Sequence, residues 1–332
     1  MIIVRVPFRV SLFGGGTDFK SFYSKNKCTY VSFSIDKYCY INVRKLLPYF
    51  NTRYRISWSK IEEVGSIKDI SHPSIRACLN YLNVSDGLEI HTVGDLPARS
   101  GLGSSSSFTA GLLSALYLYK NKPFKNYQIA NETIHVEQNI LKENVGLQDQ
   151  IQVCHGGFNV TTIFPDSTYS LLSFNNTSSF VRQINESIVL VYSGVTRNSS
   201  DIHNMNQQSI SKSVYNSSLE SISRIAHEFS DSLIRHEATF EIFSEYMKDS
   251  WSAKCKTFPK NDVTNKMIEI YNEGIMSGAL CGKLLGAGGG GFFAFFVPKN
   301  DQKKFKVSMK KYICVSASIS FSGIQKVNYE NF

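Results

Sequence analysis

Residues 97–107, which read PARSGLGSSSS, constrain the fold of this chain more than any other stretch. The pattern at residues 88–93 predicts a strand before this loop, and the apolar spacing at residues 108–119 predicts a helix after it. Gly101 and Gly103 permit backbone angles in which successive N–H groups turn toward one anion. A glycine loop between a strand and a helix N-terminus is suited to bind a phosphate. The alternative is a flexible Gly/Ser linker, but linkers rarely lie directly between a strand and an apolar helix.

Two further glycine-rich motifs occur, one near each end of the chain. Residues 6–18 read VPFRVSLFGGGTD, and residues 283–291 read KLLGAGGGG. No Gly-Lys-Ser/Thr follows the glycines of the central loop, which excludes a Walker-type nucleotide loop. The three motifs, in this order, resemble those of the GHMP kinase superfamily, which holds galactokinase, homoserine kinase and mevalonate kinase. The resemblance extends over nearly the whole chain.

The order of predicted elements indicates an α+β protein of two lobes. With 332 residues and 42% hydrophobic residues, the chain is large enough to bury two cores. Strand patterns alternate with helical ones in the first half, a long helical region follows, and strands return near the end. The GHMP resemblance implies a mixed α/β N-terminal domain at residues 1–185 and a ferredoxin-like α+β domain at residues 186–332. The predicted strands are 2–6, 29–35, 39–45, 88–93, 157–163, 187–192, 291–297 and 315–321, and the predicted helices are 74–82, 105–119, 127–142 and those within 201–271.

Charge, cysteines and hydropathy narrow the environment and the partners. The formal charge is +9, but Lys and Arg are dispersed with no basic run of five, so we expect attraction to phosphorylated small molecules and no nucleic-acid binding. Seven cysteines without a CxxC pair argue against a disulfide framework and a zinc site, and favour the cytoplasm. No apolar run approaches the length of a membrane span, so no membrane partner is expected. The sequence leaves a homodimer open.

The central loop and one glutamate are expected to form the part of the site that binds the phosphates and the metal ion. Glu137 lies within an apolar helical pattern, where a solvated surface glutamate is the commoner explanation on composition alone. The GHMP resemblance implies instead a magnesium-ligating glutamate on this helix, with Ser105 as a second ligand. It also implies that ATP is the phosphate donor. The residues expected to bind its phosphates are Pro97, Ser100, Gly101, Leu102, Gly103, Ser104, Ser105, Ser106 and Ser107.

An aspartate and an arginine are the candidates for acting on the acceptor hydroxyl. Asp149 follows a glycine break at the start of a helical pattern, which by itself is typical of a capping or first-turn aspartate. The resemblance to galactokinases implies that this carboxylate faces the sugar hydroxyl as a base or an orienting group. Arg9 occupies the arginine position of the first motif, and a nearby cation would keep the Asp149 carboxylate ionised.

The first glycine motif is the expected sugar site. Gly14, Gly15 and Gly16 let a ligand approach the backbone, and Asp18 after Thr17 offers two acceptor oxygens to sugar hydroxyls. A tight turn with a capping aspartate is the alternative. Galactokinases carry Gly-Glu-His-Thr-Asp here, so the Gly-Gly-Gly-Thr-Asp of this chain makes galactose doubtful and leaves room for a larger sugar. The variant resembles the branch that holds D-glycero-D-manno-heptose 7-phosphate kinase and fucokinase-like enzymes.

This branch implies a Mg²⁺- and ATP-dependent sugar kinase. It would phosphorylate the anomeric hydroxyl of D-glycero-D-manno-heptose 7-phosphate to the 1,7-bisphosphate, for nucleotide-heptose and surface polysaccharide biosynthesis. Arg197 and Lys254 are candidate cations for the 7-phosphate, although a lone basic residue is more often a solvated one; Gly288 and Gly289 complete the expected substrate residues. An L-fucokinase or other hexose kinase, and an inactive sugar and ATP sensor, are the alternatives.

Overall fold

The computed structural model describes residues 1–195, 212–258, 261–286 and 289–329. In this part of the chain, eight strands form a first sheet, with the order β12-β1-β2-β5-β3-β4 and with β6 and β7 attached through β2. The long strand β2 pairs with β5 along its second half and with β6 along its first half. The strands are β1 (Ile2–Phe13), β2 (Cys28–Lys45), β3 (Tyr54–Ser57), β4 (Ile61–Val64), β5 (Leu88–Gly94), β6 (Phe158–Ile163), β7 (Tyr169–Phe174) and β12 (Gln325–Tyr329).

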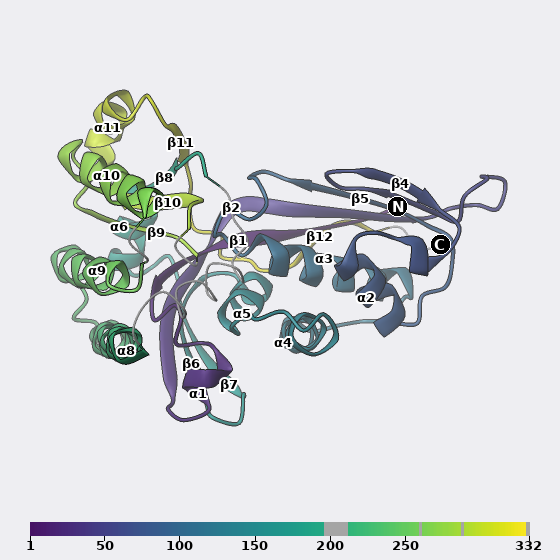
Figure 1. Cartoon of the computed structure of the whole chain (residues 1–332), viewed down its shortest axis with the longest axis horizontal. Coiled ribbons are helices and arrows are strands. Elements are labelled where there is room, and N and C mark those ends of the chain that lie inside the picture. The colour runs from purple at the N-terminus through teal and green to yellow at the C-terminus, as the bar shows by residue number, and fades with distance from the viewer. Residues whose placement is uncertain (196–211, 259–260, 287–288, 330–332) are drawn as a thin grey trace.

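Helices α2 (Pro73–Tyr81), α3 (Ser104–Tyr119), α4 (Asn126–Ile134) and α5 (Gln148–His155) lie together on one side of this sheet (Figure 1). Helix α3 is buried along most of its length and packs directly on β1 and β2. The approach is close at Gly111, where a Cβ would lie 2.8 Å from Cγ1 of Ile41. The short helix α1 (Lys20–Tyr23) and a 3-10 turn at Ile67–Asp69 complete this lobe.

A second, antiparallel sheet has the order β11-β8-β10-β9. When these four strands are numbered from first to fourth along the chain, their order in the sheet is 4-1-3-2, which is that of a ferredoxin-like sheet. The predicted two-lobed α+β class is confirmed. Its strands are β8 (Ile188–Tyr192), β9 (Cys281–Leu284), β10 (Phe292–Phe296) and β11 (Ile313–Ser316); the helices around it are α6 (Ser179–Ser187), α8 (Lys212–Ile234), α9 (Phe240–Cys255), α10 (Asp262–Met276) and α11 (Gln302–Ser308), with a 3-10 turn at Lys299–Asp301.

Strand β10 joins two cores because its side chains alternate between the two faces of the sheet. Phe293 and Phe295 enter a core with α10 and α11, whereas Phe292 and Phe296 enter the large core that also contains the first sheet. In that large core, Phe13 of β1 lies 4.6 Å from Phe229 of α8, measured between ring centroids. The two lobes are therefore packed together through aromatic side chains.

Several elements depart from the sequence-based expectation. The predicted helix 127–142 is divided: α4 ends at Ile134 and a π-helical segment follows at His135–Ile140. The short strands β3, β4, β7, β9 and β12 and helix α11 were not predicted, and β11 lies earlier than the expected 315–321. The predicted domain boundary near residue 185 falls inside α6, and β12 lies in the first sheet, so the boundary stays a prediction.

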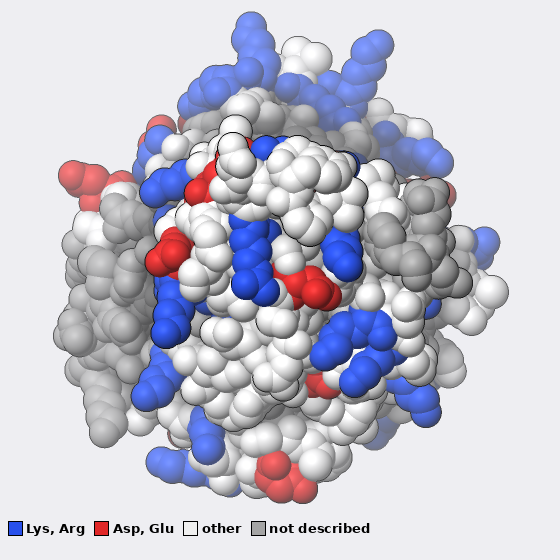
Figure 2. Space-filling model, turned by 90° about the vertical axis from the view of Figure 1, so that its right-hand side faces the viewer, with Lys and Arg blue, Asp and Glu red and all other residues white. Residues whose placement is uncertain are grey.

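Figure 2 shows one face of the molecule, on which Lys and Arg side chains lie in small groups separated by uncharged surface. On this face the basic side chains are therefore not gathered in one patch. Within the described residues, no helix combines the length and apolar character that a membrane crossing requires.

Candidate active site

A cavity of about 950 Å³ lies where the two lobes meet. Its walls come from β1, the loop after β5, the start of α5, helices α8 and α9, and strand β9. This volume is at the upper end of the range for small-molecule sites. The cavity can therefore hold two ligands of moderate size side by side.

The predicted phosphate loop is packed into the molecule between β5 and α3. Gly101 and Gly103 have φ angles of +78° and +72°, which favour glycine. At Gly101, a Cβ would lie 2.5 Å from the carbonyl oxygen of Leu285, so the central loop touches the C-terminal glycine motif. The peptide N–H groups at the start of α3 follow immediately, and a free linker is inconsistent with this packing.

The loop residues divide into those that face the cavity and those that support the loop. Ser106 is buried and donates a hydrogen bond to Oε2 of Glu137 at 3.0 Å, and Ser107 donates to the carbonyl oxygen of Pro7 at 3.0 Å. Of the residues predicted to bind phosphate, Gly101, Gly103, Ser104, Ser105 and Ser106 line the cavity, as do Ala98 and Arg99 of the same loop; Pro97, Ser100, Leu102 and Ser107 do not.

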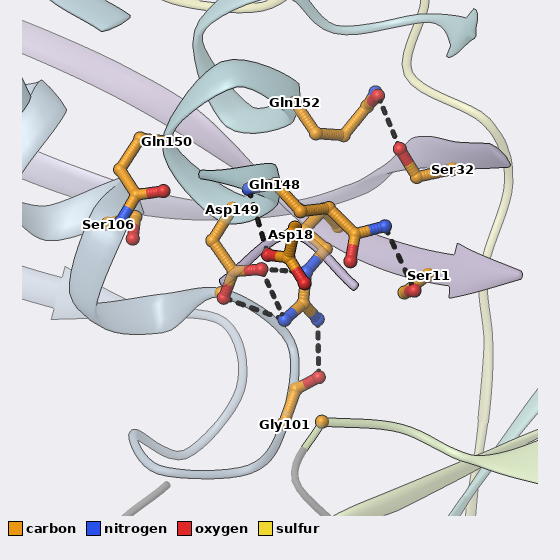
Figure 3. A network of polar contacts seen from close by, with 12 residues as sticks. Ser11, Asp18, Ser32, Gly101, Ser106, Gln148, Asp149, Gln150 and Gln152 are labelled. Atoms are coloured by element: carbon orange, nitrogen blue, oxygen red, sulfur yellow. Dashed lines mark hydrogen bonds and ion pairs between the residues drawn. The ribbon is translucent and has the colours of Figure 1, made fainter. Parts of the chain in front are cut away.

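Arg9 and Asp149 form a two-pronged ion pair in the cavity wall (Figure 3). Nε and Nη2 of Arg9 each donate a 2.7 Å hydrogen bond, to Oδ1 and Oδ2 of Asp149 respectively. Nη1 of Arg9 donates to the carbonyl oxygen of Gly101 at 2.5 Å. Arg9 is almost fully buried, while the Asp149 side chain keeps 31% of its surface exposed. One arginine thus fixes the orientation of a reachable carboxylate and ties it to the phosphate loop.

Glu137 fits a metal ligand. Its side chain is buried in the π-helical segment, a feature that often occurs at functional sites. Ser106 and Gln150 both donate to Oε2, whereas Oε1 has no partner among the described residues. Burial is the main cause that raises the pKa of this carboxyl to about 8, and the nearby Glu143 acts in the same direction. A bound cation would satisfy the free oxygen and stabilise the ionised form.

The described residues contain no group of three or more His, Cys, Asp or Glu side chains that could enclose a metal. Mg²⁺ in kinases needs only one or two protein oxygens, because substrate phosphates and water complete its coordination. Glu137 together with a hydroxyl of the serine run therefore suits Mg²⁺ better than a metal held by protein alone.

The Gly-Gly-Gly-Thr-Asp turn of the first glycine motif also contributes to the cavity wall. Gly15, Gly16 and Asp18 line it, whereas Gly14 and Thr17 do not. Thr17 is buried and donates to the carbonyl oxygen of Gly14 at 2.7 Å, which closes the turn. Asp18 accepts hydrogen bonds from the backbone N–H groups of Gly16 and Gln148, at 2.9 and 3.2 Å. Burial, followed by the charge of Asp149, raises the pKa of Asp18.

Of the two basic residues predicted to bind the substrate, the structure describes only Lys254. Lys254 lines the cavity from α9, and its Nζ donates to the carbonyl oxygens of Leu284 and Gly286, each at 2.7 Å. Gly289 is buried and does not line the cavity. Arg197 and Gly288 lie outside the described residues. Residues 198–211 of the polar stretch 198–218 also lie outside the described residues, and residues 212–218 belong to helix α8.

Other cavity residues were not identified from the sequence. Trp58, His72 and Phe108 form an aromatic group in which His72 lies 4.7 Å from each of the other two rings. Tyr215 and Leu219 of α8 cover the glycine-rich wall. None of these follows from local spacing, because they come from segments far apart in the sequence. Lys283 also lines the cavity. Its position inside the third glycine motif was the one feature of the sequence that could have identified it as a site residue.

A phosphate loop and an arginine-held carboxylate that face the same cavity define a phosphotransferase with a hydroxyl group as acceptor. Residues 71–157 match the sequence model of the family described as GHMP kinases N terminal domain. The chain resembles this family over that region, and it is similar to heptose phosphate kinases along nearly its full length. Members of the family are ATP-dependent kinases.

Individual relatives are distant but match the chain along nearly its full length. The D-glycero-alpha-D-manno-heptose 7-phosphate kinase of Campylobacter jejuni is 24% identical over 322 residues, which is 93% of both proteins. The crystal structure of a D-glycero-D-manno-heptose 1-phosphate kinase from Bacteriodes thetaiotaomicron superposes with a TM-score of 0.78, at 18% identity and full coverage of both chains. Galactokinase from Lactococcus lactis gives a TM-score of 0.73 at 14% identity, with 98% of this chain and 95% of that one covered.

Proposed function

We propose that this protein transfers a phosphoryl group from Mg·ATP to the anomeric hydroxyl of D-glycero-D-manno-heptose 7-phosphate. The observation that carries the proposal is the position of Asp149: it lines one cavity together with the phosphate loop and the Gly-Gly-Gly-Thr-Asp turn, and Arg9 ties it to that loop. The similarity to the Campylobacter enzyme over 93% of the chain supports the choice of sugar.

In this proposal Asp149 orients the acceptor hydroxyl and accepts its proton. The two hydrogen bonds from Arg9 hold the plane of the carboxylate in one orientation. The 31% exposure of the Asp149 side chain leaves its oxygens accessible to a hydroxyl. Because Arg9 also bonds to Gly101, the carboxylate and the phosphate loop are held in a fixed relation, which aligns acceptor and donor.

The phosphate groups would bind the cavity-facing residues of the loop, from Gly101 to Ser106, with α3 behind them. Glu137 and Ser105 are the residues that would hold Mg²⁺. The metal ion, when bound, neutralises charge on the phosphates. Gln150 and Ser106 keep the Glu137 carboxylate in place through its other oxygen.

The sugar would bind along the turn at Gly14–Gly16, with Asp18 accepting hydrogen bonds from its hydroxyls. A contribution of Gly288 and Gly289 stays a prediction from the sequence. Arg197 and Lys254 are the proposed cations for the phosphate that the sugar already carries. The product would serve nucleotide-heptose and surface polysaccharide synthesis. We place this activity in the cytoplasm, since all seven cysteines are free thiols and ATP is the donor.

A hexose kinase is the second candidate. The chain is 26% identical over 225 residues to the bifunctional fucokinase/GDP-fucose pyrophosphorylase of Arabidopsis thaliana, which is 66% of this chain but only 21% of that protein. An inactive sensor is less consistent with the site, because a sensor has no need for an oriented carboxylate beside the phosphate loop.

The test is ADP release from Mg·ATP with four acceptors: D-glycero-D-manno-heptose 7-phosphate, the unphosphorylated heptose, L-fucose and galactose. Phosphorus NMR of the product identifies an anomeric phosphate. Asp149→Asn, purified in parallel, excludes a contaminating kinase. Preferred turnover of the heptose phosphate supports the proposal, turnover of a free hexose replaces it with the second candidate, and binding without turnover leaves a sensor.

A further inference from the structure

Two lysines, one of them buried and the other partly buried, line the cavity without a carboxylate partner among the described residues. Lys254 comes from α9 and Lys283 from β9. Among the residues that the structure describes, neither ammonium group has an Asp or Glu oxygen within 4.0 Å. Asp149 is the nearby carboxylate, and its two oxygens already accept hydrogen bonds from Arg9. The positive charge of the two lysines is therefore not neutralised by the protein described.

Both ammonium groups are held by backbone carbonyls. Lys254 donates to Leu284 and Gly286, and Lys283 donates to Leu12 at 2.6 Å. A carbonyl satisfies a donor but does not cancel its charge. Burial lowers the pKa of both lysines, that of Lys254 to about 7, and Arg9 acts in the same direction on each. Arg9 and the two lysines thus disfavour a charge on one another, and an anion bound among them would favour the protonated lysines.

The position of Lys254 indicates where this anion would be. Gly286, whose carbonyl Lys254 holds, is in close contact with Gly101 of the phosphate loop, and Arg9 holds the carbonyl of Gly101. The lysine therefore lies beside the junction of the two glycine loops, next to the Arg9–Asp149 pair. This is the part of the cavity where the donor and acceptor sites meet.

We propose that Lys254 and Lys283 form a binding subsite for a phosphoryl group at the junction of the two glycine loops. The subsite deepens the proposed kinase function and rests on it for the ligand. A phosphoryl dianion has two sources in that reaction, the terminal phosphate of the nucleotide and the phosphate ester of the acceptor. Each lysine still has N–H donors beyond its carbonyl bonds to offer such a group.

The first arm of the test compares binding of ADP with binding of the β,γ-imido analogue of ATP by calorimetry. Lys254→Met, Lys283→Met and the wild type are measured, with Lys256→Met on the exposed end of the same helix as the control. If the lysines hold the terminal phosphate, the Lys254 and Lys283 variants bind the analogue about 10- to 100-fold more weakly, the range for a lost hydrogen bond to a charged group, and bind ADP as before.

The second arm measures KM for the heptose 7-phosphate and for the free heptose. A KM that rises only for the phosphorylated sugar, with unchanged nucleotide affinities, assigns the subsite to the acceptor's phosphate. Unchanged affinities for every ligand, together with a lower melting temperature, would mean that the lysines only fasten the loops, and the proposal would be overturned. Lys254→Arg keeps the charge, and its recovery of affinity separates loss of charge from misfolding.

Failure of the kinase proposal can be distinguished from failure of the subsite proposal. If the wild type turns over no sugar, the nucleotide arm still reports on the subsite. If it binds no nucleotide either, the same variants are titrated with inorganic pyrophosphate. Weaker pyrophosphate binding by Lys254→Met supports a phosphoryl subsite, and equal or absent binding in wild type and variant contradicts it.

Discussion

Arg9 and Asp149 are 140 positions apart in the sequence, yet they form the most constrained contact of the site. The residue types could be chosen from the sequence because each lies in a recognisable motif. Their two-pronged geometry, and the further bond from Arg9 to Gly101, could not, since it depends on how β1, α5 and the phosphate loop pack.

Asp149→Asn keeps the size of the side chain but removes its charge and one of its acceptors. We expect kcat to fall about 10²- to 10⁴-fold, the usual range for loss of a proton acceptor, with ATP affinity retained. Steady-state kinetics and nucleotide titration measure the two quantities. A variant with wild-type kcat would exclude Asp149 from the reaction.

Lys254 links stability to pH. Its folded pKa of about 7 lies below the ordinary value of 10.5, mainly because the side chain is buried. Between these values the unfolded chain binds more protons than the folded protein, so this group's stability contribution is complete above about pH 10.5 and is lost as pH falls toward 7. The charged or titratable groups around it include Arg9, Lys283 and Cys255, and burial raises the pKa of the Cys255 thiol to about 11.

In Lys254→Met this contribution to the pH dependence disappears. Urea unfolding at about pH 7 and about pH 9.5 should show a smaller gain in unfolding free energy with pH than in the wild type. Lys256→Met, which changes an exposed lysine, should keep the wild-type gain. Equal gains in wild type and Lys254→Met would show that the lysine is not desolvated.

At the scale of elements, the main strands and helices were predicted where their pattern was long. Helix α3 and strand β5 lie within a residue of their predicted limits. The short strands β3, β4 and β9 were missed because four residues carry too little alternation to distinguish them from loops. The division of the helix at Ile134 also has no local signal, although it determines where Glu137 points.

Helix α10 and strand β9 enclose the ring of Phe295 between two glycines. A Cβ at Gly274 would overlap this ring, and one at Gly282 would lie 2.5 Å from its Cδ1 atom. Gly274→Ala should therefore lower the free energy of unfolding by about 1–3 kcal/mol, reduced by the better helix propensity of alanine. The urea midpoint measures this loss.

Gly65→Ala is the matched control, because no atom lies within 4 Å of the added methyl group. Its midpoint should stay near that of the wild type. A Gly274→Ala protein that is as stable as this control would mean that Phe295 can move aside at no cost.

At the scale of the whole molecule, the aromatic core between the lobes favours unfolding as one unit. Phe229 contacts Phe13 of the first lobe and Phe180 and Phe243 of the second-sheet helices. The sequence predicted two lobes but did not reveal this shared core, because the residues come from β1, α6, α8 and α9.

The two tryptophans report on the two lobes separately, since Trp58 follows β3 and Trp251 belongs to α9. In Trp58→Phe and Trp251→Phe proteins, fluorescence should give the same urea midpoint. Phe229→Ala, introduced into both, should lower the two midpoints together, by about 3–5 kcal/mol in unfolding free energy. Phe164→Ala, at an exposed phenylalanine, should leave them unchanged. Separate midpoints would show that the lobes unfold independently.

The pairing of β12 with β1 has a consequence for synthesis on the ribosome. Strand β1 is translated before the other strands of its sheet, and β2 can pair with it early, but the other edge at Ile2–Arg5 finds its partner only when residues 325–329 have been translated. Until then this strand edge is open to solvent, and such edges can pair with other nascent chains. Arg9 lies on the same strand, beyond the segment Ile2–Arg5 that β12 covers, so pairing of this open edge with another chain would also hold back the strand that carries a site residue.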